Sequence, residues 1–133
     1  MRASAPSQTE RATADCIQVF VYRVPKKNHE AFAETEGRLA DLFRKAGITN
    51  SEFFTLKPAR IFGGFTNVAE SVSAGEDEEL WLEIDSYRDE QDRDEVVKRI
   101  GQDPAARPLF QKVLSLCAPG SQSLQGDFVR TEM

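Results

Sequence analysis

The sequence predicts one α+β domain in which four strands and two helical segments follow the order βαββαβ. Two patterns support this prediction. Runs rich in β-branched and aromatic residues occur at 16–24, 51–56, 79–87 and 124–130, and apolar residues recur with helical spacing at 28–46 and between 89 and 114. Of the 133 residues, 40% are hydrophobic and 29% are charged, which is typical of a single globular domain. We expect this domain over 16–133, after a flexible tail at 1–15.

The first strand and the first helix are predicted from residues 16–46. The strand ends at Pro25, and its alternation places Ile17, Val19 and Val21 on one side. A helix over 28–46 is predicted to begin at Asn28 as its N-cap. Its apolar stripe consists of Phe32, Leu39, Leu42, Phe43 and Ala46, and Gly47 provides a left-handed end.

A short strand at 51–56 precedes a long connection over 57–79, which the sequence does not assign to a regular element. Ile61 and Phe62 are compatible with a strand, and Gly63-Gly64 predicts a turn, with a hinge for a lid as the alternative. Long connections of this kind are either functional or mobile.

The clearest strand is 79–87, where Leu80, Leu82 and Ile84 alternate with a second set of residues. We expect this aliphatic set, like Val19 and Val21, to pack against the helices. The other side of the sheet then carries the aromatic and polar residues Gln18, Phe20, Tyr22, Trp81, Glu83, Asp85 and Tyr87.

The second helical segment is predicted to be broken. One helix opens at Asp89 and ends at Gly101, and Asp103-Pro104 has the N-cap and proline pattern of a new start. The final strand is 124–130. The complete order is that of a ferredoxin-like domain with a four-stranded antiparallel sheet. The uncovered face of this sheet would expose a patch of apolar side chains to water. We therefore expect two copies to pair face to face as a homodimer.

Charge and composition exclude several classes of function. The net charge is −5, and eleven acidic residues lie between Glu76 and Glu95. Without a basic stripe we expect no nucleic acid as a partner, and without a long apolar segment we expect no membrane association. No secretory pattern is present, which favours a cytoplasmic protein. Cys16 and Cys117 are expected to be buried and reduced.

Several runs resemble the uncharacterised YbaA-like family. They are Val24-Pro25-Lys26-Lys27-Asn28 followed by Phe32, and later Tyr87-Arg88, Arg93-Asp94, Val96 and Asp103-Pro104. The resemblance spans residues 16–130. It implies a place in the dimeric α/β barrel superfamily, whose members pair two ferredoxin-like sheets. One departure is Gly126, which is followed by Asp127 where the family tends to have a second glycine. The family has no settled activity, so the resemblance implies a fold and a dimer.

The candidate site is the polar side of the sheet. Glu83, Asp85 and Tyr22 are the candidate catalytic residues, because partly buried carboxyl groups are used in acid–base chemistry. The candidate ligand-binding residues are Gln18, Phe20, Trp81 and Tyr87. The alternative is that all of these are polar residues at a hydrated dimer interface.

No metal site or cofactor is expected. His29 is the only histidine, it is expected at the surface, and no Cys/His cluster accompanies it. No nucleotide-binding glycine motif occurs. Three functions follow: a small-molecule-binding protein of unknown ligand, a cofactor-independent monooxygenase-like or isomerase-like enzyme, or a structural or stress-related interaction protein.

Overall fold

The computed structural model describes residues 14–133, so the predicted tail at 1–15 lies almost entirely outside the described residues. At its end, the Asp15 backbone N–H donates to the carbonyl of Arg88, and its own carbonyl accepts from Arg130. Asp15 is therefore already part of the sheet margin.

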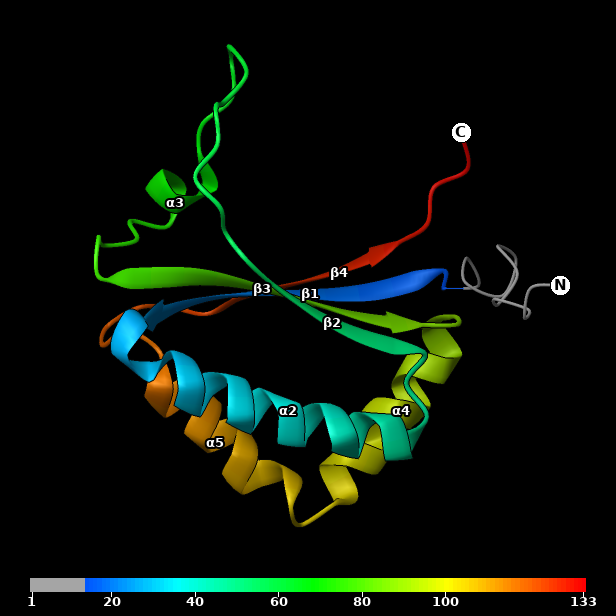
Figure 1. Cartoon of the computed structure of the whole chain (residues 1–133). Helices are drawn as coiled ribbons and strands as arrows, with labels where there is room; N and C mark the ends of the chain where they lie inside the picture. Colours follow the sequence, from blue (N-terminus) through cyan, green and yellow to red (C-terminus); the bar gives the residue numbers. More distant parts are fainter. Residues whose placement is uncertain (1–13) are drawn as a thin grey trace, which may run out of the picture.

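Four antiparallel strands form one sheet in the order β2-β3-β1-β4 (Figure 1). The strands are β1 (Cys16–Pro25), β2 (Asn50–Thr55), β3 (Glu78–Tyr87) and β4 (Leu124–Val129). With the long helices between β1 and β2 and between β3 and β4, this order confirms the predicted ferredoxin-like topology.

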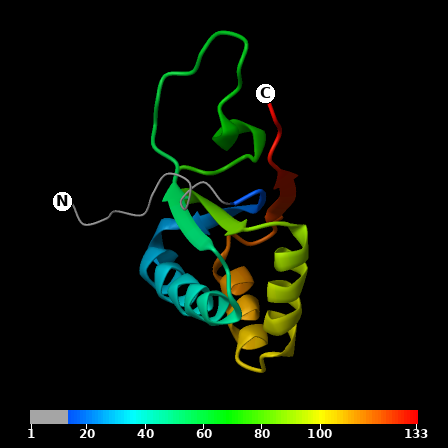
Figure 2. The ribbon, with the colours of Figure 1, turned by 90° about the vertical axis from the view of Figure 1, so that its right-hand side faces the viewer.

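All three long helices cover one face of the sheet, as Figures 1 and 2 show. They are α2 (His29–Ala46), α4 (Glu90–Gln102) and α5 (Ala106–Leu116), and a short 3-10 turn, η1 (Lys26–Asn28), precedes α2. No helix layer covers the other face in the described part of the chain; we call it the open face. The connection between β2 and β3, with the short α3 (Val68–Ser71), and the C-terminal end of the chain after β4 rise on that side.

Local details differ from the predictions at the ends of the helices. Asn28 does not cap α2, because its side-chain amide donates to the carbonyl of Leu116 at 3.0 Å and ties α2 to α5. Gly47 does end α2: it has φ of 106° and donates to the carbonyls of Phe43 and Arg44. The next helix, α4, continues through Gly101 to Gln102.

The connection after β2 has no strand at Ile61 and Phe62. The predicted turn at Gly63-Gly64 is present, closed by the N–H of Phe65 donating to the carbonyl of Phe62 at 3.1 Å. Gly64 has φ of 89°, a conformation that favours glycine.

The core lies between the sheet and α2. Tyr22 and Trp81 pack edge-on against Phe32, with ring centroids 5.4 and 4.9 Å away. Cys16 and Cys117 are both buried and free, as predicted.

Candidate functional site

The strand register brings all seven predicted site residues to one face of the sheet. On β1 and β3, Gln18 lies opposite Asp85, Phe20 opposite Glu83, and Tyr22 opposite Trp81, while Tyr87 lies opposite Cys16. That they would share one face was predicted from the alternation of β3. Their catalytic and ligand-binding roles remain predictions.

The expected orientation of that face was wrong. Because Tyr22 and Trp81 contact Phe32 of α2, the aromatic and carboxyl set points toward the helices, and the aliphatic set lines the open face. Leu82 and Ile84 are accordingly only half-buried, whereas Glu83 and Asp85 are 7% and 1% exposed. Period-2 alternation separates the two sets but does not say which one faces inward.

A third carboxyl group, that of Glu36, joins the two predicted ones. Glu36 lies on α2 and is 3% exposed. The Tyr22 hydroxyl donates to Glu83 Oε1 at 2.9 Å, and the Ser51 hydroxyl of β2 donates to Asp85 Oδ1 at 2.6 Å. Glu36 Oε2 is the one buried side-chain oxygen among residues 14–133 that has no hydrogen-bond partner. We call Glu36, Glu83 and Asp85 the carboxyl cluster.

Burial raises the pKa of every member of the carboxyl cluster. It raises the pKa of Glu83 to about 8 and that of Glu36 to about 7, and the negative charge of a neighbouring carboxylate acts in the same direction for both. For Asp85, burial together with hydrogen bonding to Glu83 raises the pKa to about 8. Burial and the neighbouring Glu83 charge also raise the pKa of Tyr22. The cluster therefore holds protons near neutral pH, where exposed carboxyl groups hold none.

Sequence reasoning missed Glu36 and Ser51. The signal for Glu36 was available, since it stands four residues after Phe32 and three before Leu39, on the apolar stripe of the helix. A carboxyl group at such a position is buried once the helix docks. Ser51 had no comparable signal, because its contact with Asp85 depends on the β2–β3 register.

His29 was expected at the surface. It is half-exposed, and its Nδ1 lies 2.8 Å from Glu79 Oε1, which also accepts from the Trp81 indole at 3.0 Å. This hydrogen bond raises the pKa of His29. Within residues 14–133, no group of three or more His, Cys, Asp or Glu side chains is arranged to hold a metal ion.

The β4 edge of the inner face is polar and exposed. Gln125 and Asp127 of β4 lie opposite Phe20 and Gln18, and both are exposed. Phe20 is half-buried and Gln18 is 8% exposed, so exposure falls from β4 toward the carboxyl cluster.

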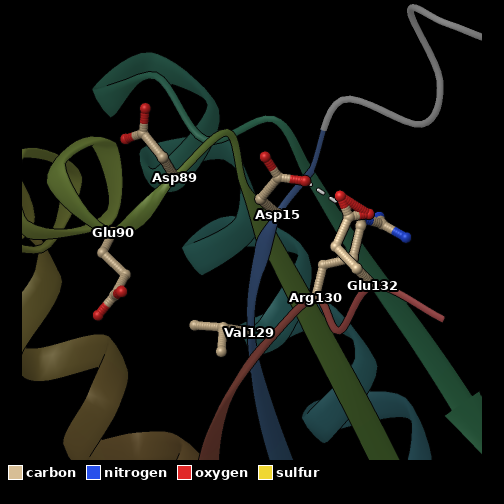
Figure 3. A pocket seen from close by; sticks show the side chains of 6 residues that line it. All are labelled: Asp15, Asp89, Glu90, Val129, Arg130 and Glu132. Atoms are coloured by element: carbon tan, nitrogen blue, oxygen red, sulfur yellow. Dashed lines mark hydrogen bonds and ion pairs between the residues drawn. The ribbon is translucent and has the colours of Figure 1, made fainter.

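The hollows found among the described residues lie elsewhere, and two of them bear on the candidate site and the open face. One, of about 340 Å³, is apolar and lies on the open face at the base of the β2–β3 connection, next to Val21 and Leu82. Another, of about 310 Å³, is formed at the far end of the sheet by the residues of Figure 3, where Asp15 pairs with Arg130 at 3.1 Å. The acidic residues of this hollow are exposed, Asp15 pairs with Arg130, and Asp89 accepts from the N–H of Asp92. This hollow is therefore not assigned a site.

The strand order and the placement of the helices define a ferredoxin-like domain. From residue 15 to residue 114 the chain matches the family described as "Protein of unknown function (DUF1428)", and it belongs to that family. The more specific resemblance to YbaA-like proteins remains a prediction. None of the curated proteins compared with the chain matches it.

Similar solved structures share the fold at low sequence identity. A monooxygenase from Streptomyces coelicolor, solved in complex with nanaomycin D, has a TM-score of 0.60 and 12% identity, with 96% of each chain covered. A dimeric ferredoxin-like protein from an uncultured marine organism has a TM-score of 0.58 and 9% identity, covering 92% of this chain and 95% of that one. A NIPSNAP family protein from Agrobacterium tumefaciens has a TM-score of 0.55 and 10% identity, covering 90% and 88%.

The solved structures share the fold of this chain, and its family is described as one of unknown function. No helix among the described residues is long and apolar enough to cross a membrane.

Proposed function

We propose that the protein binds a small organic molecule on the inner face of its sheet, against the carboxyl cluster. The observation that carries this proposal is the orphaned Oε2 of Glu36, buried beside Glu83 and Asp85. A buried polar atom without a partner costs roughly 1–3 kcal/mol, and three adjacent buried carboxyl groups add to that cost. A ligand that donates a hydrogen bond to Glu36 would satisfy this oxygen.

The hydrogen bonds within the site favour a ligand that carries a donor. The hydroxyls of Tyr22, Ser51 and Tyr87 already donate to Glu83, Asp85 and Gln18. When Glu36 is ionised, the remaining capacity is therefore an acceptor, its Oε2. A hydroxyl or amine group next to an apolar or aromatic body fits this acceptor and the neighbouring rings.

A second candidate function is cofactor-independent acid–base catalysis by Glu83, Asp85 and Tyr22. The observation that favours it is the raised pKa of both carboxyl groups, about 8, which suits proton transfer at neutral pH. The fold it shares with a monooxygenase is compatible with this candidate but does not argue for it, because one fold carries many activities.

We also propose that the protein forms a homodimer in which the open faces of two copies cover each other. The open face presents Val19, Val21, Leu82 and Ile84 without cover in one protomer, and Phe54 next to Leu82 is 46% exposed. A large apolar patch on a monomer marks an interface, and two-fold pairing is the commonest way to cover it. Two similar structures are themselves dimeric ferredoxin-like proteins.

A thermal-shift screen of the purified protein against a metabolite library tests the site. A ligand favouring the native state raises the melting temperature by mass action. We expect a specific shift that is lost in Glu36→Gln and in Glu83→Gln but retained in Glu34→Gln, an exposed control on the same helix. Loss of turnover in Glu83→Gln with the melting temperature preserved would select the enzyme. If no compound changes the melting temperature, the proposed site is contradicted. The structural or interaction role is then the function that remains.

A further inference from the structure

The connection from Leu56 to Asp77 is an arm with an apolar tip. At its tip, the side chains of Phe62 and Phe65 are 83% and 66% exposed, and Ile61 is 41% exposed. The two phenylalanine rings pack edge to face with centroids 6.5 Å apart. An exposed aromatic pair at the end of a long loop is the kind of surface that a partner covers.

The arm rises on the open face of the sheet. Figures 1 and 2 show it projecting away from the helices, and its base residues Leu56 and Val68 line the apolar hollow together with Val21 and Leu82. A molecule that docks on the open face therefore lies beside the arm.

The length of the arm matches a second sheet. The outgoing limb from Leu56 to Phe62 spans at most about 23 Å if extended, whereas packed sheets lie about 10 Å apart. The tip can thus pass the partner's sheet and reach its flank.

The segment 57–69, which includes the tip of the arm, carries a charge opposite to that of a second copy. Its charged residues are Lys57 and Arg60, which give +2, whereas Glu70, Glu76 and Asp77 nearer the base are acidic and bring the whole arm to −1. This basic segment is attracted to a partner of the same sequence, whose net charge is −5.

We propose that the arm is a clasp: in the homodimer, the Phe62–Phe65 tip of each protomer packs on the flank of its partner. This inference rests on the proposed dimer through the open face and adds a second contact to it. It explains why large apolar side chains lie exposed at the tip of the arm.

The first test measures the dimer dissociation constant of the full chain by light scattering and sedimentation over a dilution series. We expect Phe62→Ser with Phe65→Ser to raise the constant by about tenfold or more, because buried aromatic anchors dominate interface energetics. Leu114→Ser, which removes another exposed apolar side chain (59% exposed) on the helix layer, should leave the constant unchanged. All variants should keep the melting temperature of the monomeric unit, since these side chains do not contact the core.

The second test replaces Phe62 with p-benzoylphenylalanine and irradiates the dimer. A covalent product of two chains, mapped from residue 62 to the partner's flank, is expected. An unchanged dissociation constant in the serine variant, or cross-links within one chain only, would overturn the clasp.

Three further outcomes test the clasp and its premise, the dimer through the open face. If Leu82→Glu dissociates the dimer while the serine variant leaves the dissociation constant unchanged, the sheet interface stands and the clasp fails. If the wild type is monomeric at every concentration, both fail. Binding of the wild type, but not of the serine variant, to phosphatidylcholine–phosphatidylglycerol vesicles with an unchanged dimer would assign the tip to a membrane and also overturn the clasp.

Discussion

Replacing Glu36 with Gln should change how stability depends on pH. In the folded protein, burial and the nearby charge of Asp85 raise the pKa of Glu36 from 4.5 to about 7. The native state therefore binds this proton more tightly than the unfolded chain does. Its contribution to stability is fully present below pH 4.5 and is lost as pH rises to 7.

The magnitude follows from the size of that change in pKa. A rise from 4.5 to about 7 corresponds to about 3 kcal/mol between the two limits. Glu83 and Asp85, whose pKa values are also raised, act in the same direction. The wild type should consequently be more stable near pH 5 than near pH 8.

Urea denaturation at pH 5, 6, 7 and 8 measures this dependence. Between pH 5 and pH 8, Glu36→Gln should lose about 2–3 kcal/mol less stability than the wild type, because an amide does not ionise. Glu34→Gln, whose exposed carboxylate pairs with Arg38 at 3.2 Å, should follow the wild-type curve. Parallel curves for the wild type and Glu36→Gln, or a wild type that gains stability toward pH 8, would refute the reasoning.

Three more outcomes are expected. Leu82→Glu places a charge in the centre of the open face and should turn the proposed dimer into a monomer, which light scattering detects as a mass near the 14.9 kDa of one chain. Glu79→Gln removes the carboxylate that hydrogen-bonds His29 and should lower the pKa of that imidazole, measured by NMR titration; an unchanged value would show that the pair does not form in solution. Gly47→Ala should cost about 1–2 kcal/mol in urea denaturation, because φ there is 106° and the added Cβ would lie 3.2 Å from Arg99 Nη1; no loss would contradict the left-handed helix end.

The topology could be predicted because its signals are local. The alternation of β3, the stripe of α2 and the left-handed Gly47 each depend on neighbouring residues, and together they determined the order of elements. The β2–β3 connection could not be assigned, since apart from the four-residue α3 it has no period and contacts the sheet only at its base. The hydrogen bond of Asn28 could not be predicted either, because its partner, Leu116, is 88 residues away in the sequence.

The orientation of the sheet could not be read from hydrophobicity. In a domain that pairs sheet to sheet, both faces are buried in the assembly, so both carry apolar residues. The inner face must also fill the space under α2, which the large rings of Tyr22 and Trp81 do. Aliphatic side chains such as Leu82 and Ile84 form a flatter surface suited to another sheet.

This orientation separates the candidate site from the interface. If the carboxyl cluster lay between two sheets, dissociating the dimer would expose it to water and return its pKa values to the ordinary range. Because Glu36 reaches Glu83 from a helix of the same protomer, the cluster is complete in one chain. We therefore expect the monomeric Leu82→Glu variant to retain the pH dependence of stability near 7, and to lose it only when Glu36→Gln is added. Loss of that dependence on dissociation alone, measured by urea denaturation of the monomer, would mean that the partner subunit shields the cluster and that the site belongs to the dimer.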